Sequence, residues 1–181
     1  GGNGRFATVL KNTINSKMTS KNTEIHLFRH GETDWNVEGR FQGIEVSKLT
    51  EKGILQAKQL GNKLKNIKFD NIYSSPSLRT KQTAYNIWPN KKDKIRFLDE
   101  LVEIRLGRLE GKLYSDIKEN DFKSYDHFFN KPHLFSVEGA ENFKELTNRA
   151  FKVISKLSEN NIGRRIAIVS HGAFIKSFMT Y

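Results

Sequence analysis

A histidine follows an arginine at the end of a short apolar run, and this pattern can support covalent chemistry. The motif Arg29-His30-Gly31-Glu32-Thr33 comes directly after Glu24 to Phe28, a run that predicts a strand. Parallel α/β sheets place their active sites beyond the carboxyl ends of strands. An imidazole that stays neutral near pH 7 can attack an electrophile, and a neighbouring guanidinium favours an anionic one. We therefore interpret His30 as a candidate nucleophile toward a phosphoryl group.

Three other segments carry residues that complement His30. Arg79 follows the apolar stretch Phe69 to Tyr73 at the start of a predicted helix, where anions bind. The triplet Ser170-His171-Gly172 follows a β-branched run and repeats the first arrangement. The segment from 101 to 111 supplies carboxylates after a fourth predicted strand, and a protonated carboxyl there can act as a general acid.

These four motifs together resemble the histidine phosphatase superfamily, which includes cofactor-dependent phosphoglycerate mutases and small phosphatases. The resemblance covers residues 24 to 180. It depends on four motifs that occur in the family's order and approximate spacing: Arg-His-Gly-Glu, Ser-x-x-x-Arg-x-x-Gln-Thr-Ala (Ser75 to Ala84), Glu-x-x-x-Gly-x-x-Glu-Gly (Glu103 to Gly111) and Ser-His-Gly.

The resemblance implies a role for each matching residue. His30 becomes the nucleophile that is phosphorylated, while Arg29, Arg79 and His171 line the phosphate pocket. Two guanidiniums and an imidazolium can stabilise the charge of a transferring phosphoryl group, so neither a metal nor a cofactor is expected. Glu103 takes the position of the family's acid, which protonates the leaving alcohol. The remaining substrate-binding residues that the resemblance implies are Asn36, Gln42, Gly43 and Gly172.

Some of these residues have competing interpretations. Glu100 and Glu110 compete with Glu103 for the role of the acid, and Arg79 is also compatible with an exposed helix surface. His26 lies on the opposite face of its strand from Leu27, which favours a structural, hydrogen-bonded side chain. The same interpretation applies to the other two histidines, His127 and His133.

Strands alternate with helices along the chain, which predicts a three-layer α/β/α sandwich with a mostly parallel central sheet. A helix is expected from Glu51 to Asn66 with Thr50 as its N-cap, because apolar residues recur there every three or four positions. The aromatic stretch from Phe122 to Phe135 is expected to form a lid or side wall, or plain core. The other predicted elements are strands 24–28, 71–74, 95–98 and 165–170 and helices 78–87, 140–157 and 173 onward.

Two enzymatic activities share these motifs, because water as acceptor gives a phosphatase and a second alcohol gives a mutase. Only a short span separates Gly111 from the helix predicted near Ala140, and Gln42-Gly43 looks more like the small phosphatases. Phosphomonoester hydrolysis is therefore favoured over phosphoglycerate mutase-type transfer. A basic nucleic-acid-binding protein and a catalytically silent scaffold are the alternatives from other classes.

Composition sets the wider expectations. A chain of 181 residues fits one α/β domain, and its net charge of +11 suits phosphorylated anions, although the lysines are scattered. The chain contains no cysteine and shows no apolar signal or transmembrane run, so the cytoplasm is the expected compartment. The expected partner is a small phosphorylated metabolite, with no nucleic acid and no membrane.

The two ends of the chain depart from the family pattern. The chain stops at Tyr181, where family members continue into further strands, so residues 21 to 181 are expected to form the domain without its last strands. Residues 1 to 20 are expected to be either a passive leader or a relocated edge strand, in which Phe6 to Leu10 pairs with an exposed edge of the sheet. A homodimer is an alternative way to cover that edge.

Overall fold

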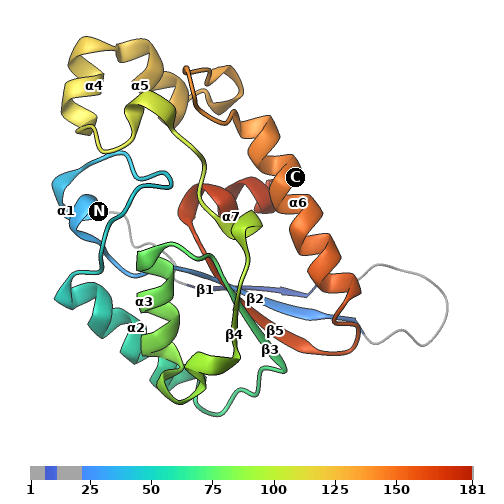
Figure 1. Cartoon of the computed structure of the whole chain (residues 1–181). Helices are drawn as coiled ribbons and strands as arrows, with labels where there is room; N and C mark the ends of the chain where they lie inside the picture. Colours follow the sequence, from blue (N-terminus) through green and yellow to red (C-terminus); the bar gives the residue numbers. More distant parts are fainter. Residues whose placement is uncertain (1–6, 12–21, 181) are drawn as a thin grey trace.

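A computed structural model describes residues 7–11 and 22–180, shown in Figure 1. The strands are β1 Ala7–Lys11, β2 Glu24–Arg29, β3 Asn71–Ser74, β4 Ile95–Phe97 and β5 Arg165–Ser170. The helices are α1 Asp34–Glu38, α2 Glu51–Leu64, α3 Leu78–Ile87, α4 Tyr114–Asn120, α5 Phe122–Phe129, α6 Phe143–Glu159 and α7 Gly172–Met179. Short 3-10 helices lie at Pro89–Lys94, Asp99–Leu101, Gly107–Leu109 and Pro132–Leu134.

The five strands form one sheet in the order β1-β2-β5-β3-β4. Strands β2, β5, β3 and β4 run parallel to one another, so their carboxyl ends lie along one edge of the sheet. Strand β1 runs antiparallel to β2 and pairs Ala7 with Phe28 and Lys11 with Glu24. Phe6 and residues 12–20 lie outside the described residues, and the division of the chain at residue 20 stays a prediction.

Helices cover both faces of the sheet, which confirms the three-layer α/β/α prediction. Helices α2 and α3 pack on one face, and α6 and α7 pack on the other (Figure 1). The strands supply both cores by alternation: in β5, Ile166 and Ile168 belong to the cluster under α6, whereas Ala167 and Val169 belong to the cluster under α2 and α3.

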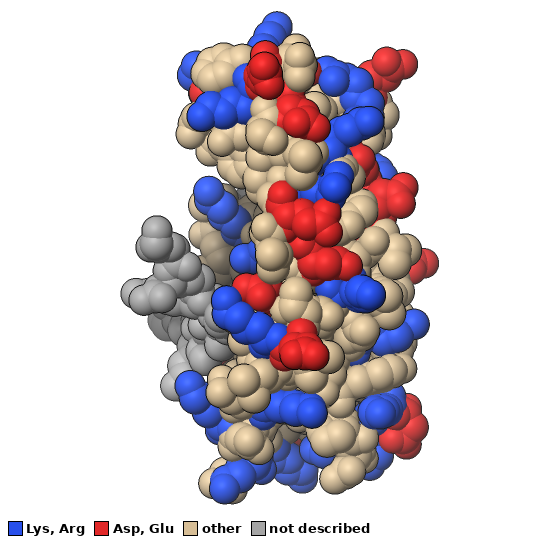
Figure 2. Space-filling model, turned by 90° about the vertical axis from the view of Figure 1, so that its left-hand side faces the viewer, with Lys and Arg blue, Asp and Glu red and all other residues tan. Residues whose placement is uncertain are grey.

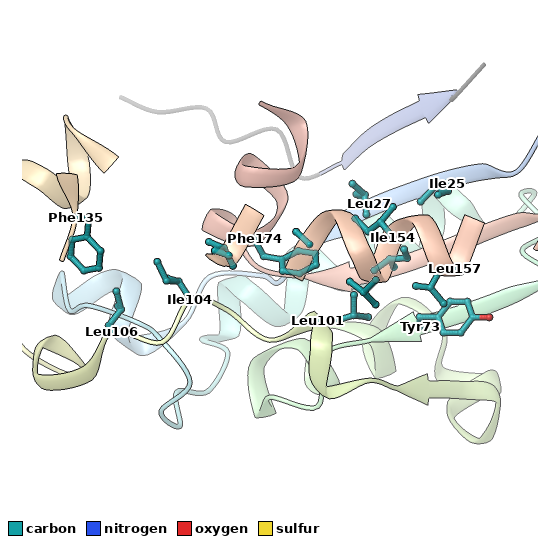
Figure 3. Close-up of a cluster of buried hydrophobic side chains, with 14 of the residues drawn as sticks. Ile25, Leu27, Tyr73, Leu101, Ile104, Leu106, Phe135, Ile154, Leu157 and Phe174 are labelled. Atoms are coloured by element: carbon teal, nitrogen blue, oxygen red, sulfur yellow. The ribbon is translucent and has the colours of Figure 1, made fainter. Parts of the chain in front are cut away.

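The cluster under α6 and α7 extends from the sheet toward the site. Figure 3 shows Ile25, Leu27 and Tyr73 at one end and Ile104, Leu106 and Phe135 at the other. The aromatic stretch predicted as lid, wall or core is both wall and core: Phe135 is buried in this cluster, while Phe128 and Phe129 of α5 line the cavity described below.

Local capping explains where the helices begin. Thr50 caps α2 by accepting from Gly53 N, as the sequence predicts. Helix α6 begins at Phe143, three residues later than expected, because Asn142 and Glu145 form a capping box. Ala140 instead pairs with Leu106 in an isolated bridge. The short helices α1, α4 and α5 were not predicted as helices, because their five to eight residues are too few to show a long apolar repeat.

Charges of both signs occur on the face shown in Figure 2. Acidic side chains lie among the lysines and arginines in its upper and middle parts, which does not favour one continuous basic stripe of the kind that tracks a nucleic-acid backbone. Among residues 7–11 and 22–180, no helix is both long and apolar enough to cross a membrane.

Candidate active site

The carboxyl ends of β2, β3 and β5 bring His30, Arg79 and His171 together. The rings of His30 and His171 are 5.4 Å apart between centroids, at an interplanar angle of 61°. The charges of Arg79 and Arg29 act on both histidines. The structure thus assembles the four residues that the sequence places after three separate strands.

His30 is held in one tautomer. Its Nδ1 lies 2.8 Å from the Gly31 carbonyl oxygen, which can only accept, so Nδ1 carries the hydrogen and Nε2 keeps its lone pair. Burial, together with the charges of Arg79 and Arg29, holds the pKa of His30 well below its usual range. The imidazole is therefore neutral at pH 7, as a nucleophile must be.

His171 is fully buried, and its Nε2 lies 2.8 Å from Ser75 Oγ. Burial, followed by the charge of Arg79, holds the pKa of His171 well below its usual range as well. The imidazolium assumed in the sequence analysis is therefore wrong for the protein without a bound anion. Nδ1 of His171 is buried and has no hydrogen-bond partner among the described residues.

The Arg79 guanidinium is buried and bound to the segment from Gly43 to Ser47. Its Nη2 donates to Gly43 O at 2.6 Å, and its Nη1 donates to Glu45 O at 3.1 Å and to Ser47 Oγ at 3.4 Å. Burial lowers the pKa of Arg79 to about 10, although Glu103 and Glu110 favour its charged form. Arg79 remains charged at pH 7, and its buried Nε lacks a partner within the described part of the chain.

Glu103 is anchored at the N-terminus of α7. Its Oε1 accepts from Ile104 N at 3.0 Å and Phe174 N at 2.9 Å, and its Oε2 accepts from Ala173 N at 3.0 Å. These bonds hold the carboxyl group beside the cavity that His30 also lines. Glu100 is exposed and does not line the cavity, so it is not placed to act there.

Two amides beside the cavity are oriented by a threonine that the sequence analysis missed. Thr33 Oγ1 lies 3.1 Å from Asn36 Oδ1 and 2.8 Å from Gln42 Oε1, and Ser47 Oγ also donates to Gln42 Oε1, at 2.7 Å. Because the amide oxygens are occupied, the NH₂ groups of Asn36 and Gln42 remain available as donors. The signal in the sequence was the capping box formed by Thr33 and Asn36.

These groups surround a cavity of about 230 Å³. Its lining combines polar groups of the predicted site with aromatic side chains and Lys176. The lining residues are Arg29, His30, Asn36, Phe41, Gln42, Glu103, Tyr114, Phe128, Phe129, Phe143, Gly172, Ala173 and Lys176. The sequence analysis also predicted Arg79, His171 and Gly43, which do not line the cavity: Arg79 and His171 are fully buried, and Gly43 packs against Glu110. In the described part of the chain, no group of three or more metal-ligating side chains forms a cluster.

Comparisons with known proteins agree with this arrangement. Residues 25–181 match the family model described as the histidine phosphatase superfamily, branch 1. The chain is 32% identical over 169 residues to a metal-independent phosphoserine phosphatase of Arabidopsis thaliana, covering 89% of this chain and 69% of the relative. It is 34% identical over 149 residues to a probable phosphoglycerate mutase GpmB of Salmonella choleraesuis, covering 82% and 69%. The structure of Bacillus stearothermophilus YhfR matches with a TM-score of 0.84 and 37% identity, covering 87% of this chain and 78% of that one.

Proposed function

The chain belongs to the histidine phosphatase superfamily and is a phosphatase, and from that premise we propose which of its residues carry the hydrolysis of small phosphomonoesters. The observation that carries the assignment is His30: a buried, neutral imidazole with a fixed tautomer lies beside two guanidiniums at the cavity. His30 Nε2 is the nucleophile, and Arg29, Arg79 and His171 bind the phosphoryl oxygens.

The first step transfers the phosphoryl group to the enzyme. Nε2 of His30 forms a bond to phosphorus while the bond from phosphorus to the alcohol oxygen breaks. The Glu103 carboxyl gives its proton to the departing oxygen. Oε2 of Glu103 accepts one N–H bond whereas Oε1 accepts two, so Oε2 has a lone pair left to carry this proton.

The second step returns the enzyme to its starting state. Glu103, now a carboxylate, takes a proton from water as the water oxygen attacks phosphorus and the bond to His30 Nε2 breaks. Inorganic phosphate leaves, and His30 is neutral again with its hydrogen on Nδ1. Throughout, the Gly31 carbonyl accepts from Nδ1 and stabilises the positive charge that the phosphorylated ring carries.

Two buried atoms without partners support the phosphate site. Leaving a buried polar group unsatisfied costs about 1–3 kcal/mol, yet Nε of Arg79 and Nδ1 of His171 have no partner among the described residues. If Ser75 Oγ donates to His171 Nε2, then Nδ1 carries a hydrogen. Both atoms are then donors that a bound phosphoryl group can satisfy.

The test is to trap the intermediate. Labelled substrate, quenched after brief incubation, should leave an adduct that is stable in base and labile in acid, and activity should persist in chelator. His30→Ala should lose both the adduct and the activity, whereas His133→Ala, at an exposed histidine, should keep them. An acid-stable adduct, or full activity in His30→Ala, would refute the assignment.

The same assay tests the mutase alternative. This alternative matters because the chain is similar to a probable phosphoglycerate mutase. A phosphatase releases one inorganic phosphate for each substrate consumed. A mutase moves the label to a second phosphoglycerate and releases little phosphate. We expect stoichiometric release.

We further propose that the alcohol part of the substrate carries a carboxylate. Lys176 lies one helical turn beyond Ala173 on the face of α7 that lines the cavity, and no described residue forms an ion pair with it. One relative is a phosphoserine phosphatase, whose substrate has such a group. Lys176→Met should lower kcat/KM for phosphoserine relative to ethyl phosphate severalfold, and Lys152→Met on α6 should leave this ratio unchanged. An unchanged ratio in Lys176→Met would remove the carboxylate from the proposal.

The cytoplasmic location and the homodimer stay predictions.

A further inference from the structure

The segment from Gly43 to Ser47 is held between two oppositely charged side chains. Arg79 donates to the carbonyl oxygens of Gly43 and Glu45 on one side. On the other side, Glu110 Oε1 accepts from Ile44 N at 3.2 Å, and Glu110 Oε2 accepts from Glu45 N at 3.0 Å. The side chains of Ile44 and Val46 point outward and are 47% and 70% exposed. The segment is therefore bound to the rest of the protein mainly through its backbone.

One peptide group connects the two charges directly. The oxygen of Gly43 and the nitrogen of Ile44 belong to the same peptide unit, whose C=O and N–H point in opposite directions. The cation therefore contacts the negative end of this dipole, and the anion contacts its positive end. Hydrogen bonds to charged partners are stronger than neutral ones, and Glu110 also favours the charged form of Arg79.

The Glu110 carboxylate accepts hydrogen bonds from three backbone N–H groups. Besides Ile44 and Glu45, it accepts from Leu106 N at 3.0 Å. Glu103 lines the cavity and Glu110 does not, so Glu110 drops out as the alternative acid. Gly43 is required for the close approach, because a Cβ there would overlap the Glu110 carboxylate and lie 2.9 Å from the Ile104 oxygen.

We propose that Glu110 is a positioning residue for phosphate binding, acting through the segment Gly43–Ser47 on Arg79. With Glu110 in place, the carbonyls of Gly43 and Glu45 hold the guanidinium in one orientation, in which its buried Nε has no partner among the described residues. Without Glu110 the segment loses the two charge-assisted hydrogen bonds of Ile44 N and Glu45 N, and the carbonyl acceptors that fix Arg79 are no longer held in place. This inference rests on the proposed function, because it assumes that Arg79 binds the phosphoryl group.

The test is a double-mutant cycle on phosphate binding. Competitive inhibition by inorganic phosphate is measured for the wild type, Glu110→Ala, Arg79→Ala and the double variant, with nitrophenyl phosphate as substrate. We expect Glu110→Ala to weaken phosphate binding about tenfold, an effect of about 1.4 kcal/mol. In the Arg79→Ala background the same change should cost less than twofold, because the group that it positions is gone. Equal losses in both backgrounds would overturn the proposal.

Further variants separate positioning from general damage. Gly43→Ala, which displaces the carboxylate from the opposite side, should show the same dependence on Arg79, whereas Glu159→Ala at the end of α6 should leave phosphate binding unchanged. If Glu110→Ala does not fold, Glu110→Gln enters the cycle in its place, with a smaller coupling of the same sign expected. A wild type that neither hydrolyses the substrate nor binds phosphate would refute the proposed function itself, whereas an active wild type with an additive cycle refutes the role of Glu110 alone.

Discussion

At the residue scale, the site depends on two histidines that burial keeps neutral. His30 and His171 are 4% and 0% exposed, and Arg79 lies close enough to both for its charge to favour their uncharged forms. Neutrality suits the nucleophile directly. For His171 it means that the free protein presents an uncharged donor or acceptor, and that an arriving phosphate dianion will favour its protonation.

These lowered pKa values predict how stability depends on pH. The unfolded chain protonates its histidines near pH 6.5, whereas the native state resists until the pH is well below that, so the unfolded state binds more protons in this window. Stability present above pH 6.5 is therefore lost as the pH falls, by up to about 1.4 kcal/mol per pH unit for each histidine. His171→Asn should lose less stability than the wild type between pH 7 and 5 in urea unfolding without phosphate. Parallel losses would mean that His171 does not titrate in this way.

Thr33 is expected to be the least replaceable of the hydroxyl residues near the site. In Thr33→Val the side chain keeps its shape but loses the hydroxyl that caps α1 and contacts the oxygens of Asn36 and Gln42, which keep only Thr33 N and Ser47 Oγ as donors. Stability should fall by about 1 kcal/mol, the usual cost of a lost N-cap, and KM should rise because the two amides are oriented less firmly. Thr33→Ser keeps the hydroxyl and should restore KM. If the serine and valine variants have the same KM, the hydroxyl has no positioning role.

The sequence was sufficient to predict that His30, Arg79 and His171 come together, because their motifs follow strand ends in a recognisable order. It was insufficient for Thr33, Glu110 and Lys176. The roles of Thr33 and Glu110 depend on which backbone and amide atoms lie within about 3 Å after folding. For Glu110 these atoms come from a segment about 65 residues away in the chain. The burial of Arg79 behind the segment Gly43–Ser47 was missed for the same reason.

At the element scale, α2 holds the turn that follows His30. Thr50 N donates to Glu32 O at 3.0 Å, and Glu32 N donates to Gln56 Oε1 at the same distance. The contact is close enough that a Cβ on Gly31 would lie 2.6 Å from the Gly53 oxygen. Two glycines, one on each side, therefore allow the helix and the catalytic turn to meet backbone to backbone.

The Gly53→Ala variant tests this contact, because helix propensity and close packing predict opposite changes in stability. Helix propensity alone would stabilise α2 by about 1 kcal/mol. A Cβ at this position would instead overlap the backbone of Glu32 and lie 2.9 Å from its nitrogen. We expect a net loss of stability of about 1–3 kcal/mol and a lower kcat, because the turn carrying His30 shifts. Gln59→Ala, on the exposed side of α2, should change little, and a higher melting temperature for Gly53→Ala would show that the contact is looser than described.

The start of α2 was predictable because apolar periodicity and the Thr50 cap agreed. The predicted bounds of α3 match the observed ones although Ser77 makes no side-chain cap bond. Predicted boundaries failed where an apolar or small residue preceded the true cap: Ala140 fits a helical repeat, but Asn142 and Glu145 satisfy the first free N–H groups of α6. Helix α1 has five residues, too few to show a repeat, and only its capping box marks it.

At the scale of the whole molecule, the edge of the sheet lies next to the strand that delivers His30. Strand β2 pairs with β5 on one side and with β1 on the other, along five residue pairs from Ala7 with Phe28 to Lys11 with Glu24. An unpaired β2 would expose the N–H and C=O groups of its outer edge. The sequence predicts a strand from Phe6 to Leu10 because the run is rich in apolar and β-branched residues. Its antiparallel partner could not be read from the run itself, because pairing depends on the arrangement of the whole sheet.

We propose that β1 stabilises the sheet and thereby the position of His30. Val9 pairs with His26 in the middle of β1, and Val9→Pro would remove an N–H and distort the strand. The melting temperature should fall by several degrees, because each kcal/mol lost lowers it by about 2–4 °C in a chain of this size.

Deleting residues 1–17 should produce the same shift, while Asn15→Pro, outside β1, should not. Activity at 25 °C should change less than the half-life of the enzyme at elevated temperature, since β1 pairs with β2 and none of the four motifs that carry the proposed site lies in β1. If neither Val9→Pro nor the deletion changes the melting temperature, β1 is a passive leader, and concentration-dependent melting would then indicate that a second copy of the chain covers the edge.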